Sequence, residues 1–214
     1  MARSGNDDWF RKEAWSARDE GDFRARLSRA RPEKRPQYLR IQAEHLVEAG
    51  LPEPALRLLD EFLELAPDDA FASVAHEARA RALVDLGRPD EAVAAYRAAL
   101  AAQRAHPQVK GYAALGLAEL VVYTNRRSLF DEAVAVLDTL HEESPFPAVR
   151  YREAAVRALI ADASGDRTAA RRHAQEALSS AATLNAPFAR HPGVGLVRQL
   201  DPLVHERLEA MCAA

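Results

Sequence analysis

Small residues recur at fixed spacing along this chain, and that spacing limits how it can fold. Four segments begin at Gly50, Gly87, Ser128 and Gly165, so their starts are 37, 41 and 37 residues apart. Five residues into each segment stands an alanine, at positions 55, 92, 133 and 170. Glycine can leave the right-handed helical region without a steric penalty, and alanine lets two helix backbones approach closely. The spacing therefore predicts repeated pairs of antiparallel helices joined by tight turns.

Matching small residues precede the turns. Ala43, Ala80 and Ala158 each lie seven residues before the glycine that begins the next segment. The third unit fits only if Gly116, which lies twelve residues before Ser128, takes this position. Five additional residues then need a place, and the sequence YTNRRSLF, residues 123–130, is the predicted site of this insertion.

Almost the whole chain has a helical pattern and belongs to the all-α class. Ala, Leu, Arg and Glu dominate, apolar residues return every three or four positions, and prolines cluster between the segments. The pattern predicts ten helices, over residues 17–30, 37–49, 53–65, 69–86, 90–104, 108–122, 130–142, 148–163, 167–184 and 196–211.

On these residues the chain resembles the tetratricopeptide repeat (TPR) family, whose unit is a helix pair of about 34 residues. Tyr112 and Leu115 stand at the aromatic and leucine positions of a first helix, and Pro67 and Pro145 follow second helices. The resemblance implies a right-handed α-α superhelix, a TPR-like solenoid of about four helix pairs with capping helices at both ends. The chain departs from the family pattern at the expected apolar positions Gln42, His76, Arg79 and Arg157.

The resemblance divides a single domain, 1–214, into three parts. Residues 1–35 form an amino-terminal cap, residues 36–184 the four helix pairs, and residues 185–214 a loop and a carboxy-terminal cap helix. Ser16 and Asp19 have capping-box spacing at the start of the first helix. Pro202 after Asp201 suggests a fresh helix start, or a kink, in the last one.

Composition narrows the classes of function. No apolar run reaches the length of a membrane span, and the first residues have no apolar leader, so we expect a cytosolic protein without membrane contact. The net charge is −3, and residues 41–100 alone hold 12 acidic and 5 basic residues. This acidic middle argues against a nucleic-acid partner. Cys212 is the single cysteine, so an intramolecular disulfide is excluded.

The chain lacks the common motifs of catalysis. The seven histidines are scattered, and none pairs at the i, i+4 spacing of two metal ligands on one helix face. A glycine-rich phosphate loop, a nucleophile elbow and a dinucleotide fingerprint are also missing from the sequence. Acidic pairs such as Asp90 and Glu91 are better explained by favourable placement at helix starts. We therefore expect no enzyme activity, no metal and no cofactor.

Two sets of residues are candidates for binding. In the TPR-like alignment the first helices line a concave face that holds a peptide or helix in relatives. There the candidates are Gln37, Arg40, Glu44, Glu77, Arg81, Lys110, Leu117, Arg152, Leu159 and Asp162. The second set lies in two irregular segments, 123–130 and 186–197, where an arginine fork for a carboxylate or phosphate is one reading and a solvated loop the other. Its members are Asn125, Arg126, Arg127, Arg190 and His191.

Three functions follow from these observations. The leading hypothesis is a non-enzymatic adaptor or scaffold whose concave face binds a protein or peptide partner. The second is a regulatory or sensory module that binds a small molecule or short peptide. The third is a self-assembling structural unit, for which a homodimer is possible.

Overall fold

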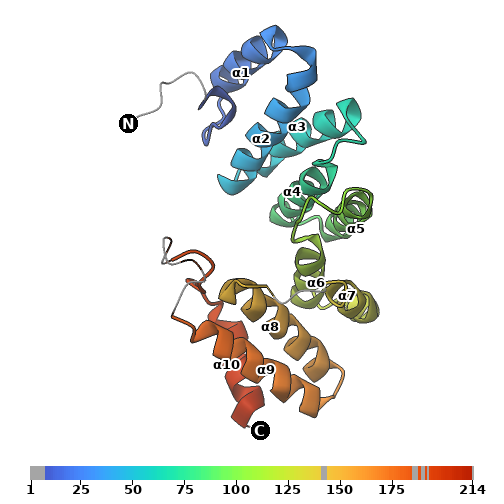
Figure 1. Ribbon diagram of the computed structural model, residues 1–214, viewed down its shortest axis with the longest axis vertical. Helices are drawn as coiled ribbons and strands as arrows, with labels where there is room; N and C mark the ends of the chain where they lie inside the picture. The colour runs from blue at the N-terminus through green and yellow to red at the C-terminus, as the bar shows by residue number, and fades with distance from the viewer. Residues whose placement is uncertain (1–7, 141–143, 185–187, 189–190, 192, 214) are drawn as a thin grey trace. The chain divides into compact units, whose positions relative to one another are not determined.

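The structure is a computed structural model that describes residues 8–140, 144–184, 188, 191 and 193–213 (Figure 1). The described residues are all-helical and contain no strand, which confirms the predicted all-α class. The chain divides into two compact units, of which the first extends to Gly116 and the second begins at Leu117. The single domain expected over residues 1–214 stays a prediction.

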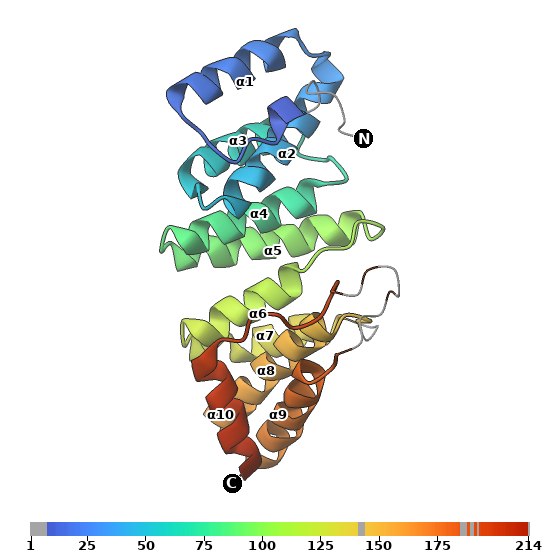
Figure 2. The same ribbon diagram turned by 90° about the vertical axis from the view of Figure 1, so that its left-hand side faces the viewer.

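The first unit consists of helices that pack against their neighbours in chain order. Helices α2 and α3, and α4 and α5, lie side by side as pairs (Figures 1 and 2). Its elements are η1 (Asp8–Phe10), α1 (Ala17–Arg29), η2 (Pro32–Lys34), α2 (Arg35–Glu48), α3 (Pro52–Leu65), α4 (Ala72–Asp85) and α5 (Pro89–Ala105).

Helix α6 (Ala113–Tyr123) contains the boundary between the two units. The second unit continues with η3 (Arg127–Leu129), α7 (Phe130–Leu137), α8 (Pro147–Ala163), α9 (Arg167–Ala181) and α10 (Pro202–Ala213). Within it α8, α9 and α10 pack together (Figure 2).

Ten α-helices are predicted and ten are found among the described residues, and three of their ends differ from the prediction by five or six residues. Helix α6 begins at Ala113 and not at 108, because the amide of Tyr112 is bound by the side chain of Glu77 at 2.9 Å. Helix α7 ends at Leu137, where the Thr139 hydroxyl donates to the backbone oxygen of Val136. Residues 141 and 142 of the predicted helix lie outside the described residues.

The third difference concerns α10, which begins at Pro202 and not at 196. The Asp201 carboxylate accepts hydrogen bonds from the amides of Leu203 and Val204, at 2.9 and 3.3 Å. Proline lacks the amide that would be left unpaired there, so the helix starts at the position that Asp201 and Pro202 favour.

The turns inside the helix pairs correct the predicted alignment of the third unit. Gly50, Gly87 and Gly165 have φ values of 71°, 66° and 81°, and Asn125, with φ of 52°, is the one non-glycine residue with a positive φ in the part of the chain that the structure describes. Asparagine tolerates the left-handed conformation better than most residues. The repeat position assigned to Ser128 therefore belongs to Asn125.

Hydrogen bonds support this correction. After each left-handed residue, the next amide donates to the carbonyl five residues earlier, at 2.9 Å in all four turns. This is the pattern of the Schellman helix end. The donors and acceptors are Leu51 to Leu46, Arg88 to Leu83, Arg126 to Val121 and Asp166 to Ala161.

In the corrected alignment, Ala118 and not Gly116 is the small residue in the first helix of the third pair. Seven residues before each left-handed residue stands an alanine with 0% of its surface exposed, at positions 43, 80, 118 and 158. The alanines predicted in the second helices, at positions 55, 92, 133 and 170, are also buried, with at most 2% exposed. The insertion is thus three residues, 127–129, which form η3 between the turn and α7.

Polar residues at expected apolar positions have specific partners. The buried side chain of Gln42 accepts from the Lys12 amide at 3.0 Å and donates to the Lys12 carbonyl at 2.8 Å. Arg79 binds Asp60 at 2.7 Å, and Arg157 binds Asp138 at 2.8 Å. Both ion pairs join residues 19 apart, so the same contact occurs in each unit.

The amino-terminal cap is an aromatic cluster held on α2. Trp9 lies 4.9 Å from the ring of Tyr38 and 5.5 Å from that of Phe23, measured between ring centroids. The predicted capping box is confirmed, because Ser16 and Asp19 each bind the other's backbone amide through their side chains.

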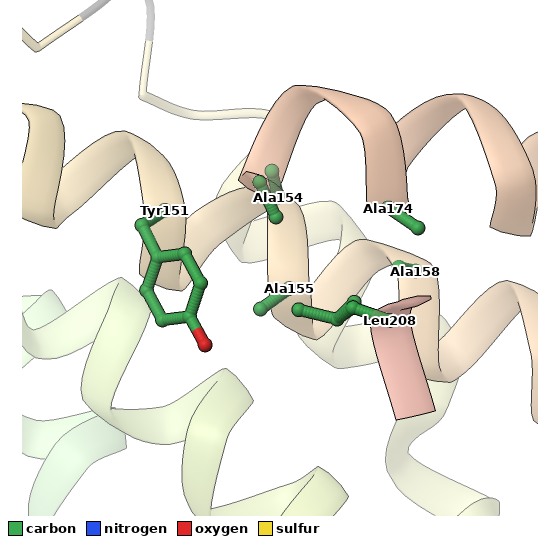
Figure 3. Close-up of a cluster of buried hydrophobic side chains, with 7 residues drawn as sticks. Tyr151, Ala154, Ala155, Ala158, Ala174 and Leu208 are labelled. Carbon is green, nitrogen blue, oxygen red and sulfur yellow. The ribbon is translucent and has the colours of Figure 1, made fainter. Parts of the chain in front are cut away.

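The carboxy-terminal cap buries one large side chain. Leu208 of α10 is fully buried with Ala155 and Ala158 of α8 and Ala174 of α9 (Figure 3). Since these neighbours are alanines, α10 packs closely on the last helix pair. Val204 and Met211 are partly buried beside them.

We expect Gln42→Leu to loosen the amino-terminal cap. The substitution leaves the amide and carbonyl of Lys12 without their partner, which costs about 1–3 kcal/mol. Chemical denaturation should show this loss, and trypsin should cleave after Lys12 faster than in the native protein. Gln103→Leu, at a partly exposed position of α5, is the matched control. Equal stability and cleavage of the two variants would contradict the role of Gln42.

His76 should be neutral in the folded protein at neutral pH. Burial and the positive charge of Arg79 lower its pKa below 6.5, while Asp60 opposes them. The folded state disfavours the proton, so this stabilisation is complete above pH 6.5 and is lost as the pH falls further. NMR titration of the imidazole measures the pKa, and Arg79→Gln should raise it. An unchanged or lower pKa in that variant would contradict the assignment.

Candidate functional site

In the first unit, the predicted groove residues of α2 are held by local contacts. Arg40 binds Glu44, one turn further along α2, at 2.5 Å. The same guanidinium lies 4.6 Å from the ring centroid of Phe71, whose side chain is 45% exposed. A cation over an exposed aromatic face offers a partner both charge and apolar surface. Gln37 is exposed near the start of the same helix.

The other candidates of this unit differ in role. The Glu77 carboxylate accepts the amide of Tyr112 and lies 2.7 Å from the place where a Cβ on Gly111 would stand. Glu77 therefore shapes the connection that precedes α6. Arg81 and Lys110 are exposed.

In the second unit, the candidates from α6 and α8 are buried or paired. Leu117 and Leu159 are buried, with 0% and 4% of their surface exposed. Arg152 forms two hydrogen bonds to the carboxylate of Glu119, at 2.6 and 2.5 Å. This two-point contact fixes the plane of the guanidinium.

Asp162 is paired with the cap helix. Arg207 of α10 donates to its Oδ2 atom from Nη2 at 2.6 Å and from Nε at 3.2 Å. Both side chains are partly exposed, so the pair contributes about 0–1 kcal/mol to stability. Its main consequence is geometric, because it fixes Arg207 at the edge of a pocket.

That pocket, here called the loop pocket, has a volume of about 460 Å³. Its floor is apolar and is formed by Val122, Phe130, Leu159, Ala163 and Val204. Its rim carries polar groups from the insertion and from α10, namely Tyr123, Asn125, Arg127 and Arg207, beside the exposed Leu203. The pocket thus joins two predicted loop residues to one predicted groove residue, Leu159.

The rim is cationic at neutral pH. Burial, with a smaller contribution from Glu119, raises the pKa of Tyr123 to about 12, so this phenol is uncharged there. Arg127 is exposed, and its Nε atom lies 3.4 Å from Oδ1 of Asn125, a weak contact. Arg127 therefore retains most of its capacity to donate to a carboxylate.

The remaining loop candidates lie elsewhere. Arg126 is half-buried, and its amide completes the turn after Asn125. His191 is exposed, and its amide donates to the carbonyl of Phe188 at 2.9 Å. Arg190 lies outside the described residues.

Sequence reasoning missed Arg207 and the importance of Ala163. Arg207 is the single arginine of α10, which contains no lysine, and its proximity to Asp162 depends on how α10 packs. The contact joins residues 45 apart, which periodicity alone does not place together.

The described residues contain no group of three or more His, Cys, Asp or Glu side chains arranged to hold a metal ion. None of the helices in the described ranges is both long and apolar enough to cross a membrane. An apolar floor under a cationic rim suits binding of a ligand with an apolar body and a negative group.

Comparisons with protein-family models, with curated proteins and with solved structures found no match to this chain. The resemblance to the TPR family therefore stays a prediction based on the residues themselves.

Substitutions at Asn125 should separate its backbone role from its side-chain role. Asn125→Ala places an ordinary residue at φ of 52°, and the strain should cost about 1 kcal/mol. Asn125→Gly removes the strain and should recover most of that stability. Chemical denaturation measures both. Equal losses in the two variants would assign the effect to the lost side chain instead.

Proposed function

We propose that this chain is a non-enzymatic adaptor that binds a peptide segment of a protein partner in the loop pocket. The observation that carries the proposal is the apolar floor bordered by the free donors of Arg127. An apolar side chain of the partner fills the floor, and a carboxylate near it binds the guanidinium.

A TPR-like architecture is part of the proposal. It is supported by the four left-handed turns with the same hydrogen bond and by the eight buried alanines. In such repeats the first helices form the binding face. The sequence predicts that Leu159 of α8 lies on that face, and Leu159 also lines the loop pocket. It therefore connects the predicted binding face with the predicted loop site.

The groups at the pocket favour binding over chemistry. The described residues that line it include a tyrosine, an asparagine and two arginines, and none of them is an aspartate, glutamate, histidine or cysteine. Arginine remains protonated, so it serves as a fixed cation and not as an acid or base. A cytosolic location belongs to the same proposal and is supported by the single cysteine.

A regulatory module that binds a small molecule is the second candidate. The pocket volume of about 460 Å³ lies within the range of small-ligand sites. A free carboxylic acid with a branched or aromatic body would satisfy the same floor and rim. Its binding would not need the rest of a peptide chain.

Short peptides that end in leucine or phenylalanine test the proposal. Each peptide is compared in two forms, with a free and with an amidated carboxyl terminus. We expect binding of the free form, and at least a roughly tenfold loss on amidation, since about 1.4 kcal/mol of a charge-assisted contact disappears. Fluorescence polarisation measures the affinity. Isocaproate and phenylacetate, tested alone, decide between the adaptor and the small-molecule module.

Two variants locate the site. Arg127→Glu reverses the rim charge, and Ala163→Leu fills the floor without changing any charge, so both should weaken binding. Arg104→Glu on α5, with the same charge change in the other unit, is the control. If both pocket variants bind the peptides as well as the control does, the loop pocket is not the site.

A further inference from the structure

A second cleft, here called the arginine cleft, lies between α9 and α10 in the second unit. Its volume is about 700 Å³. Four arginines line it, Arg167, Arg171 and Arg172 from α9 and Arg207 from α10. Ala170 and Met211 supply apolar surface between them. The cleft therefore combines concentrated positive charge with an apolar strip.

Two of these charges are not compensated within the described part of the chain. Arg207 is bound to Asp162, and Arg172 lies 4.0 Å from the carboxylate of Glu176. The side chains of Arg167 and Arg171 are exposed and form no hydrogen bond or ion pair with described residues. Their guanidinium groups are available to a ligand.

Arg167 and Arg171 repel each other in the absence of a ligand, and a bound anion would reduce this repulsion. They stand four residues apart on α9, so their like charges face the same side of the helix. Arg167 is also the first residue of α9, where the helix dipole is positive and a cation is unfavourable. An anion held between them would remove the repulsion.

We propose that the arginine cleft binds an acidic segment of a protein partner, in which carboxylates flank an apolar side chain. The carboxylates bind Arg167 and Arg171, and the apolar side chain lies on Met211. The two sites share Arg207, but Arg167 and Arg171 line the arginine cleft and not the loop pocket, so substitutions at these two residues test this site separately.

Charge and shape favour this occupant over a nucleic acid. Among the described residues, none that lines the cleft has an aromatic side chain on which a base could stack. Asp162 lies in its wall, and Asp166 precedes Arg167 at the start of α9, so a continuous phosphate backbone would meet negative charge. Separate carboxylates on a peptide can bind the arginines and avoid these groups.

Binding of a synthetic peptide tests the proposal. The probe is a fluorescein-labelled peptide of aspartate and glutamate with central leucines, and its amide counterpart contains asparagine and glutamine instead. The full chain should bind the acidic peptide and not the amide form, with an affinity that falls as salt rises. Equal binding of both forms would overturn the proposal.

Charge reversal locates the binding. The double variant Arg167→Glu with Arg171→Glu should weaken binding of the acidic peptide at least about tenfold, as expected for two lost charge-assisted contacts. Glutamate at 167 is favourable in the first turn of α9, and glutamate at 171 is a good helix former, so α9 should remain folded, which circular dichroism checks. Arg31→Glu with Arg104→Glu makes the same charge change at exposed positions of the first unit and should leave the affinity within about twofold.

Three results would contradict the proposal. The first is equal weakening by both double variants, which would indicate an effect of net charge. The second is displacement of the peptide by inorganic phosphate at a similar concentration, which would indicate a site for small anions. The third is tighter binding of a single-stranded oligonucleotide that depends on Arg167 and Arg171. Peptides for the loop pocket should bind the Arg167 and Arg171 variant unchanged, so failure here leaves the proposed function standing.

Discussion

The left-handed residue at the end of each first helix is the constraint on which the described helix pairs depend. It reverses the chain through the same hydrogen bond in four turns, and an alanine with no exposed surface always stands seven residues before it. A larger side chain at that alanine would force the two backbones apart, because the close packing leaves no space for additional methyl groups. The backbone conformation and the close packing therefore select glycine or asparagine at one position and alanine at the other.

Much of this architecture could be predicted from the sequence, because the turn and the close packing each require a particular type of residue at a fixed position. Glycine marks three turns, and alanine marks the second helices at constant spacing. The third turn is predicted at the wrong residue, because Asn125 takes the left-handed conformation that glycine takes in the other three turns. Alignment on the second helix then shifted the turn to Ser128 and the small residue to Gly116. The backbone angle, and not the residue type, restores Asn125 and Ala118.

The candidate site was less predictable, because helix spacing indicates a face but not which charges on it are already paired. The sequence predicts that Arg152 and Asp162 lie on a binding face, and both residues do lie on α8. Their partners Glu119 and Arg207 stand 33 and 45 residues away, on other helices. Such pairs depend on tertiary packing, which one sequence does not record. Arg127 differs, because the insertion that carries it interrupts the repeat and was visible as an excess of residues.

Both proposed sites lie where the repeat is broken, and the packing explains why. In the regular pairs the second helix begins two residues after the left-handed residue, whereas α7 begins five residues after Asn125. Arg127, the first of the extra residues 127–129, lines the loop pocket together with the ends of α6 and α8. The arginine cleft lies beside α10, which follows the last pair without starting another. Regular contacts bury the surfaces that they use, so the irregular positions are the ones left with donors and apolar area for a partner.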